Sequence, residues 1–449
     1  MSGLIVDGLG MPAIRSTIMA LAQSPAHQEL LATAQRVLPG GSNGNVILPP
    51  EQAFVLAAGQ GTRVYDVEGH CWIDYLLGSG PMILGHAHPE VVAAVQEQLS
   101  KGSTFFYLHE KAIRLAEAIV DAMPCAEQVR FTSSGTEATF FALRVARAFR
   151  SRDKILKFEG AFHGSHDYAM MSTEGQPPSE LPRAVRGSAG IPQSLENEVL
   201  IAPFNDLDQT TAIIERYHQD LGAVIVEPFQ RMLSPVPGFL QGLREVTAHY
   251  GIPLIFDEVV TSFRFAYGGA QEYYGVTPDL AAIGKIVGGG YPLAAVVGKA
   301  DMMSTFVQPN EDGVAIGQVG TLNGNPIAAA AGLATLAVLR QPGTYQRLHA
   351  LGQQLRAILQ ATLHEHRVAG QVLGDGPLYH VVFTPQPIHN YRDTLTGDAQ
   401  KQRIFHRELL NHGVLKPASK GYISLVHSDA DVAETAKAFD AAMAQVAHS

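Results

Sequence analysis

The first regular hydrophobic pattern in the chain is helical. Apolar residues recur with a helical period over residues 29–38, and the pattern stops at Pro39-Gly40-Gly41, residue types that end helices. Apolar and polar residues then alternate along GTRVYDVEGHCWIDY (residues 61–75), on both sides of an acidic-glycine pair. This alternation predicts a β-hairpin.

The pattern changes at about residue 88. Helix-like segments at residues 89–99, 112–122 and 137–149 alternate from there with short apolar runs, which read VRFT, KILKF, VLIAP, AVIVEP and PLIFDEVV. Alternating strands and helices predict an α/β domain around a mostly parallel sheet. We expect a large domain over residues 76–335.

The last part of the chain lacks this regular alternation. It contains helical stretches and two short apolar runs, LYHVVFT and YISLVH, which we interpret as strands. We therefore predict a smaller α+β domain that is built from both ends of the chain, residues 1–75 and 336–449.

Composition narrows the class of protein. The 449 residues are 46% hydrophobic and 16% charged, as in an ordinary globular protein with a large core. The net charge is −10 and no Lys/Arg run occurs, so we expect no nucleic-acid partner. Only Cys71 and Cys125 are present, which excludes a disulfide framework and a four-cysteine zinc site.

The sequence predicts neither a secretory signal nor a membrane-spanning helix. The N-terminus lacks the basic start and apolar run of a secretory signal. The longest apolar run, residues 327–339, has 13 residues and reads as a buried helix after Pro326, because a span needs roughly 20. With so few cysteines, we expect a cytoplasmic protein without a membrane partner.

Three strand ends carry the candidate chemistry, since ligands of open α/β sheets bind at the carboxyl ends of strands. VRFT runs into Ser134, Gly135 and Thr136 and then into a helix, whose first N–H groups could bind a phosphate. A plain helix cap is the alternative. A second apolar strand ends in Asp257-Glu258. A carboxylate there could pair with a cationic ring nitrogen; the alternatives are an acid in a surface turn and a metal ligand.

Lys285 is the third candidate. It stands in an apolar segment directly before a run of glycines, and lysine is rarely buried without a role. A desolvated lysine has a lowered pKa and can react with a carbonyl group. The alternative is a lysine whose amine reaches the surface.

The order of these three elements resembles fold-type I pyridoxal-phosphate enzymes. Within them the chain is similar to class III aminotransferases, especially the glutamate-1-semialdehyde aminomutase branch. The matching segments cover residues 35–340 densely; they include LPGG, GPMILGHAHP, VRFTSSGTEA, KFEGAFHGSHD, LIFDEVVTSFR, GKIVGGG and GTLNGNP.

The resemblance implies a role for each matching residue. Lys285 would bind pyridoxal 5′-phosphate covalently, and Asp257 would pair with the ring nitrogen. Phe162 and Val259 would contact the two faces of the ring. The phosphate would be held by Ser134, Gly135 and Thr136 and by Thr321 of a second subunit, which implies a homodimer. His163 and Glu227 would also lie at the cofactor; for Glu227 and Glu258 a structural role stays open.

The substrate pocket departs from the aminomutase pattern. Ile47 occupies the position of an arginine that holds the substrate carboxylate, Ser79 replaces a tryptophan, and KPASKGYISLVH lacks an acid. Lys416 or Lys420 could hold a carboxylate instead. We therefore predict an aminotransferase acting between an amine or amino acid and a keto or aldehyde acceptor. An aminomutase or a racemase, which would share the cofactor residues, is the alternative.

Two other classes of protein are alternatives. A metal-dependent hydrolase would rest on the pairs His86/His88 and His163/His166, but these lie in segments that bind no metal in the family, so we expect no metal. A non-catalytic relative would be expected to lack Lys285 or Asp257, and both are present.

Overall fold

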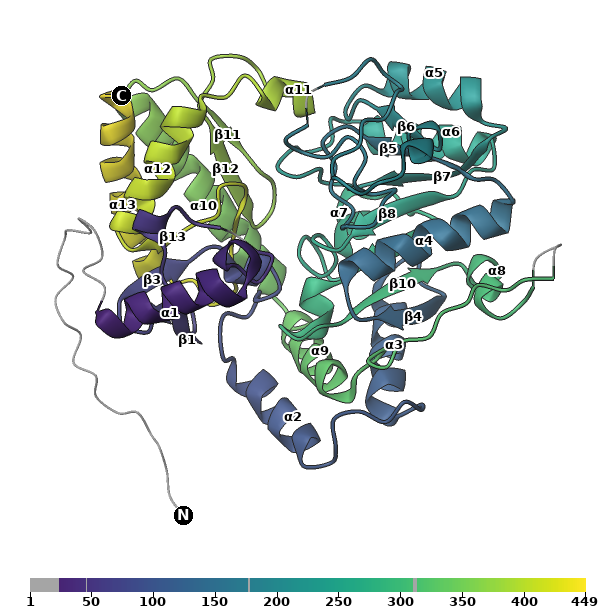
Figure 1. Ribbon diagram of the computed structural model, residues 1–449, viewed down its shortest axis with the longest axis horizontal. Helices are drawn as coiled ribbons and strands as arrows, with labels where there is room; N and C mark the ends of the chain where they lie inside the picture. The colour runs from purple at the N-terminus through teal and green to yellow at the C-terminus, as the bar shows by residue number, and fades with distance from the viewer. Residues whose placement is uncertain (1–23, 46, 177, 310–312) are drawn as a thin grey trace.

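The computed structural model describes residues 24–45, 47–176, 178–309 and 313–449. In Figure 1 the two ends of the chain gather in one half of the molecule, and the middle of the chain forms the other half around a large sheet. Within the described residues, no helix is both long and apolar enough to cross a membrane.

The large sheet has seven strands in the order β4-β10-β9-β8-β7-β5-β6. Neighbours from β9 to β6 are parallel, whereas β10 is antiparallel to both β4 and β9. β4 therefore runs in the same direction as β9, and the carboxyl ends of six strands meet at one edge. The strands are β4 (Gln128–Thr132), β5 (Lys154–Phe158), β6 (Val199–Ala202), β7 (Leu221–Val226), β8 (Leu254–Glu258), β9 (Leu280–Ile283) and β10 (Ala294–Gly298).

The central strands are buried on both faces, which explains their nearly continuous apolar sequences. α9 is apolar around its whole circumference and is buried against α2 and α3. The helices of this half are α2 (Pro89–Leu99), α3 (Glu110–Ala122), α4 (Gly135–Arg150), α5 (Leu207–Tyr217), α6 (Phe239–His249), α7 (Gly269–Tyr274), α8 (Ala300–Met303) and α9 (Pro326–Leu339).

The other half joins the two ends of the chain in one sheet. β13 (Val414–Leu415) pairs in parallel with β3 (Cys71–Asp74), which continues into β2 (Arg63–Asp66) and β1 (Leu56–Gln60). β2 and β3 form the predicted hairpin. A three-stranded sheet joins β11 (Gln371–Leu373), β12 (Leu378–Val382) and β14 (Gly421–Tyr422); the helices are α1 (Pro25–Val37), α10 (Thr344–Glu365), α11 (Tyr391–Thr394), α12 (Ala399–Asn411) and α13 (Asp429–Ala447).

Two expectations about these elements were inaccurate. α1 begins before residue 29, because the Ser24 hydroxyl caps it by accepting the N–H of His27 at 3.3 Å. YISLVH is a strand only at its start, since β14 ends at Tyr422. Ser424 and His427 then close a turn through their side chains, 2.8 Å apart. The domain limits at 75 and 335 stay predictions.

Candidate active site

Asp257 is the penultimate residue of β8, at the carboxyl edge of the large sheet, and is almost completely buried. Its Oδ1 accepts the N–H of Val259 at 3.1 Å, and its Oδ2 lies 2.8 Å from Nδ1 of His163. Burial raises the pKa of Asp257 to about 7 and lowers the pKa of His163 to about 3, so this histidine is neutral. Among the described residues, no cationic side chain is therefore bonded to this carboxylate, and a cationic ring nitrogen would supply the missing charge.

Lys285 follows β9, the strand that pairs with β8, and its backbone is left-handed with φ of 52°. Its Nζ donates a hydrogen bond to the carbonyl oxygen of Ser79 at 2.8 Å. Burial and, to a smaller extent, the nearby guanidinium of Arg264 lower the pKa of Lys285 to about 8. A substantial fraction of this amine is therefore neutral, and able to react with a carbonyl carbon, near neutral pH.

The predicted phosphate site lies at the start of α4. The hydroxyl of Ser134 caps this helix by accepting the N–H of Glu137 at 3.2 Å, and Oγ1 of Thr136 accepts the N–H of Ser165 at 3.2 Å. Ser134 therefore does perform the cap function that was the alternative. The first N–H groups of the helix still lack acceptors within it, which leaves the helix start suited to an anion.

The side chain of Val259 lies close to both the start of α4 and Gly284, the residue before Lys285. A Cβ atom added at Gly135 would lie 2.8 Å from the Val259 side chain, and one added at Gly284 would lie 3.3 Å from it. The absence of a side chain at Gly135 is what permits this approach. Asp257, Val259, Lys285 and the start of α4 are thus brought together, as the sequence predicted.

The loop after β5 adds Phe162 and His163. The His163 carbonyl accepts the hydroxyl of Thr139 in α4 at 2.5 Å, which fixes the loop beside the helix start. The ring of Phe162 is 43% exposed, so one of its faces is available to a ligand. Glu227 directly follows β7, and its Oε2 is buried without a hydrogen-bond partner; burial raises its pKa.

Other candidates lie elsewhere or have structural roles. Thr321 lies in the exposed loop before α9 and, within the described chain, makes no hydrogen bond to the other candidates. Ile47 is 67% exposed. Glu258 is fully buried and accepts hydrogen bonds from Ala270 N–H at 2.6 Å and the Thr261 hydroxyl at 2.9 Å, so it supports the chain after β8.

The two lysines proposed as carboxylate partners differ in their location and in their hydrogen-bond partners. Nζ of Lys416 already contacts Ser419 O at 2.6 Å, Pro417 O at 3.0 Å and His380 Nδ1 at 3.2 Å, inside the C-terminal half. Lys420 instead donates to the carbonyl oxygen of Arg231 at 2.5 Å, near the sheet edge. Sequence reasoning missed Arg231; a basic residue soon after the end of an apolar strand (VIVEPFQR) was the available signal.

The histidine pairs do not form a common cluster. His86 is bonded to Asp74 at 2.7 Å, whereas His163 is bonded to Asp257. A different group, His27, Asp66 and Glu68, has the spacing of metal ligands among the described residues. Nε2 of His27 accepts the N–H of Val55 at 3.0 Å, so its proton is on Nδ1, the atom that faces Glu68 at 3.4 Å. A protonated nitrogen cannot bind a metal.

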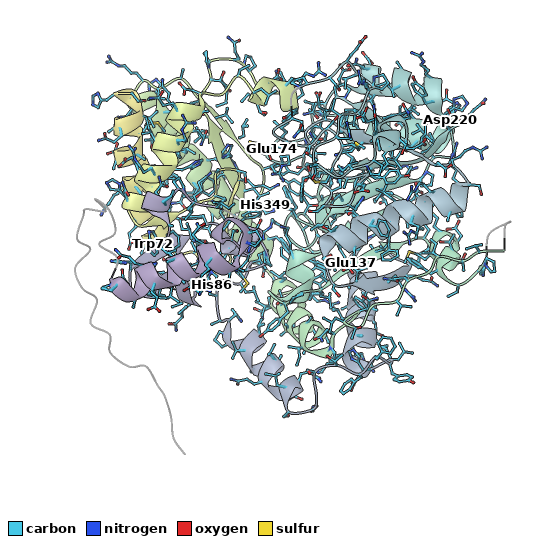
Figure 2. The ribbon with its side chains drawn as sticks, in the orientation of Figure 1. Trp72, His86, Glu137, Glu174, Asp220 and His349 are labelled. Carbon is cyan, nitrogen blue, oxygen red and sulfur yellow. The ribbon has the colours of Figure 1, made fainter. Side chains whose placement is uncertain are left out.

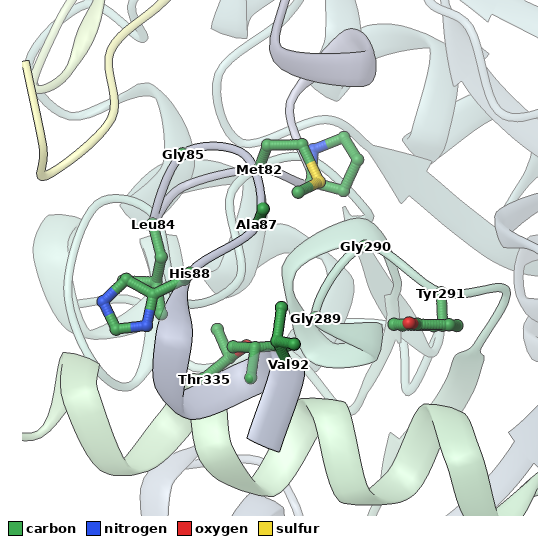
Figure 3. A pocket seen from close by; sticks show the side chains of 12 residues that line it. Met82, Leu84, Gly85, Ala87, His88, Val92, Gly289, Gly290, Tyr291 and Thr335 are labelled. Atoms are coloured by element: carbon green, nitrogen blue, oxygen red, sulfur yellow. The ribbon is translucent and has the colours of Figure 1, made fainter. Parts of the chain in front are cut away.

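A hollow of about 230 Å³ opens beside the turn that follows Lys285. Figure 3 shows its lining, with Gly289, Gly290 and Tyr291 from this turn on one side and Met82 and His88 on the other. The same loop supplies the Ser79 carbonyl that Lys285 contacts. None of the predicted cofactor residues lines this hollow, so it lies next to the turn after Lys285 without forming part of the candidate site.

Comparison with known families identifies the chain. The model of the class III aminotransferases matches residues 48–443. The chain belongs to the class III aminotransferase family. Relatives named glutamate-1-semialdehyde 2,1-aminomutase include one from Methanopyrus kandleri (40% identical; 93% of this chain, 97% of the relative) and one from Methanothermobacter thermautotrophicus (41%; 92% and 97%).

Solved structures of transaminases and of an aminomutase share the fold over nearly the whole chain. An ω-transaminase from Sphaerobacter thermophilus superposes with a TM-score of 0.89 at 39% identity, covering 94% of this chain and 98% of that one. A transaminase solved with PLP bound gives 0.86 at 32% identity (94% and 97%). A glutamate-1-semialdehyde aminomutase from Pseudomonas aeruginosa gives 0.82 at 26% identity (94% and 95%).

These comparisons confirm an α/β fold of the fold-type I class and an enzyme whose cofactor is pyridoxal 5′-phosphate. The site fits this group: Asp257 is a buried carboxylate without a bonded cation, Lys285 has a lowered pKa, and Gly135 leaves room at a helix start. The residue assignments at the cofactor stay predictions.

Proposed function

We propose that the protein is an aminotransferase, which moves an amino group from an amine or amino acid to a separate keto or aldehyde acceptor. The observation that carries this proposal is Ile47, an apolar and 67% exposed side chain where the aminomutase pattern has its carboxylate-binding arginine. A mutase must hold its intermediate until the amino group returns. A site without that clamp lets the keto product leave.

In this proposal, bound pyridoxal phosphate supplies an electron sink for the substrate carbanion. Asp257 pairs with the ring nitrogen and keeps it protonated. The start of α4 would bind the phosphate, and Phe162 and Val259 would contact the two faces of the ring. Lys285 would hold the cofactor, and its Nζ, once free, would move a proton at the substrate carbon.

The second candidate is glutamate-1-semialdehyde 2,1-aminomutase. Four curated relatives that are 39–41% identical bear this name, and their names favour isomerisation over plain amino transfer. The ω-transaminase structure is 39% identical, so overall identity does not separate the two reactions. The proposal of amino transfer therefore depends on the pocket residues.

The experiment supplies glutamate-1-semialdehyde alone to the purified, cofactor-loaded protein and measures 5-aminolevulinate. We expect little conversion, and we expect activity with a panel of amine donors and keto-acid acceptors. Efficient isomerisation without an added donor or acceptor would establish the mutase instead.

We also propose a homodimer with shared sites. Exposed apolar side chains gather on two neighbouring loops, where Tyr107 is 84%, Leu108 is 89% and Val319 is 87% exposed. His109 Nε2 contacts the carbonyl of Gly324 at 2.7 Å and joins these loops. A second copy would cover this apolar surface and bring its Thr321 to the phosphate. A cytoplasmic location also stays a proposal.

A further inference from the structure

Arg264 is a buried cation that, among the described residues, has no carboxylate bonded to it. It lies in the segment after β8 and is only 1% exposed. Its Nη2 donates a hydrogen bond to the carbonyl oxygen of Gly80 and its Nη1 to that of Ile423 at 3.3 Å, whereas its Nε is buried without a partner. Burial lowers the pKa of Arg264 to about 10, so the side chain stays charged near neutral pH. Because a buried charge of this kind is costly, we expect it to have a function.

The carbonyl group that Arg264 contacts is next in the chain to the one that Lys285 contacts. Nζ of Lys285 donates to the carbonyl oxygen of Ser79 at 2.8 Å, and the guanidinium of Arg264 donates to that of Gly80. Consecutive Cα atoms lie about 3.8 Å apart. The two cations therefore bond to neighbouring peptide groups of one loop, and their charges lie close together.

The loop that bonds both cations has an unusual backbone. Four successive residues, Leu77 to Gly80, have left-handed φ angles of 49°, 64°, 67° and 108°. Such a backbone persists only where the surrounding contacts fix it. The ring of Tyr422 is one of these contacts, since a Cβ atom added at Gly80 would lie 2.8 Å from it, and the same ring centre is 5.1 Å from Cζ of Arg264. The hydrogen bond from Arg264 to Gly80 is another.

The main chain on both sides of Arg264 is held by α10. Figure 2 shows His349 of this helix near the boundary between the two halves of the molecule; its Nε2 bonds to the carbonyl oxygen of Phe265 at 2.7 Å. The hydroxyl of Tyr345, in the same helix, donates to the carbonyl oxygen of Phe263 at 3.0 Å. The position of the guanidinium is therefore fixed by the folded chain.

The other charged groups that face Lys285 among the described residues are two carboxylates and two cations: Asp257, Glu227, Arg231 and Lys420. They come from the ends of β8 and β7, the turn after β7 and the residue before β14. Because the signs of these four charges oppose each other in pairs, Arg264 is the cation in excess. Burial lowers the pKa of Lys285 most, and Arg264 lowers it more than the other cations do.

We propose that Arg264 is a positioning residue that places a fixed positive charge beside Lys285, through the neighbouring carbonyl groups of Ser79 and Gly80. This charge opposes protonation of the Lys285 amine and so keeps the amine available for reaction with a carbonyl carbon near neutral pH. The inference goes beyond the proposed function, because an aminotransferase and an aminomutase would both need a reactive Lys285.

The experiment measures the reactivity of Lys285 in the full-length protein without cofactor, so it is independent of turnover. Formaldehyde and cyanoborohydride methylate neutral amines, and mass spectrometry of the Lys285 peptide gives the rate from about pH 6.5 to about pH 10, with the exposed Lys437 as the internal reference. In the wild type the rate should reach half of its maximum near pH 8.

Arg264→Gln keeps N–H donors for Gly80 but loses the charge. It should move the midpoint of the pH profile upward by roughly half to one pH unit, and slow methylation of Lys285 at about pH 7 roughly three- to tenfold. The maximal rate at high pH, where the amine is neutral in both proteins, should stay within about twofold of the wild-type rate. Circular dichroism checks the fold.

Arg356→Gln is the matched control and should leave the midpoint unchanged. Arg356 also donates to two main-chain carbonyl groups, those of Gly376 and Leu378 at 2.7 Å each, but inside the C-terminal half. Arg264→Met, which loses the charge without burying an amide, gives the same test if Arg264→Gln does not fold. An unchanged midpoint in the folded variant would overturn the proposal. A midpoint that moves together with a several-fold higher maximal rate would also overturn it, because that result indicates a loosened, hydrated site instead of a lost charge.

Discussion

Asp257 is buried more deeply than an ordinary carboxylate tolerates. Burial raises its pKa to about 7, and the neutral His163 beside it supplies no charge. A protonated ring nitrogen at Oδ1 or Oδ2 would therefore stabilise the ionised carboxylate, and the carboxylate would in turn keep the ring cationic. The two charges depend on each other.

The variant Asp257→Asn tests this pairing. It should keep the fold but lose on the order of a hundredfold or more in turnover, because a neutral amide cannot keep the ring nitrogen protonated. Circular dichroism checks the fold, and the exposed Asp220→Asn is the control. Turnover near the wild-type value would contradict the role of Asp257.

Lys285 makes the stability of the cofactor-free protein depend on pH. Its pKa is lowered to about 8 in the folded state, against about 10.4 in the unfolded chain. Between these values the unfolded chain binds more protons, so this group makes stability rise with pH there. Lys285→Met should therefore be more stable than the wild type at pH 7, and the gap should shrink by pH 10. Urea unfolding at both pH values measures this difference in the free energy of unfolding. A difference that grows between pH 7 and pH 10 would contradict the prediction.

At the scale of secondary-structure elements, hydrogen bonds from α11 hold the loop that follows β5 against the C-terminal half. The Tyr391 hydroxyl accepts the N–H of Gly175 at 2.9 Å and donates to the carbonyl of Gln176 at 3.1 Å. Arg392 binds both carboxylate oxygens of Glu159, at 2.7 and 3.0 Å. The positions of Phe162 and Glu174 thus depend on a helix more than 200 residues away in the chain.

Gly160→Ala tests this contact. The new Cβ would lie 2.3 Å from the Tyr391 ring in a backbone with φ of 77°. We expect a loss of roughly 3 kcal/mol in the free energy of unfolding, from overpacking and the left-handed backbone together. Gly190→Ala, with φ of 87° and no atom within 4 Å, is the matched control and should cost only about 1 kcal/mol. Equal losses in both variants would show that Tyr391 exerts no constraint.

The sequence predicted those elements that depend on residues close together in the chain. Apolar runs predicted β8, which ends in Asp257-Glu258, and β9, which ends shortly before Lys285, because both faces of these strands are buried. YISLVH is also a short run with apolar residues, yet β14 ends at Tyr422, and Ser424 and His427 bond to each other in the turn that follows. The Arg231–Glu174 pair was missed because its partners lie on different loops, 57 residues apart. Only tertiary folding brings them together.

For the whole molecule, the central prediction is a shared site. Lys285→Ala and Thr321→Ala should each be inactive alone. A mixed dimer then has one site with both lesions and one with neither, so randomly mixed subunits should recover about a quarter of wild-type activity. Sedimentation measures the oligomer, and mixing each variant with itself is the control. A fully active monomer would refute the shared site.

The measurement that tests amino transfer most directly is a single turnover without acceptor. The cofactor-loaded enzyme is mixed with an amino donor that it accepts in the panel, and the keto product that passes through an ultrafiltration membrane is quantified. An aminotransferase should release about one equivalent of keto product per site and retain the amino group on the protein until an acceptor is added. If no keto product leaves and the donor is instead isomerised in place, the account is contradicted.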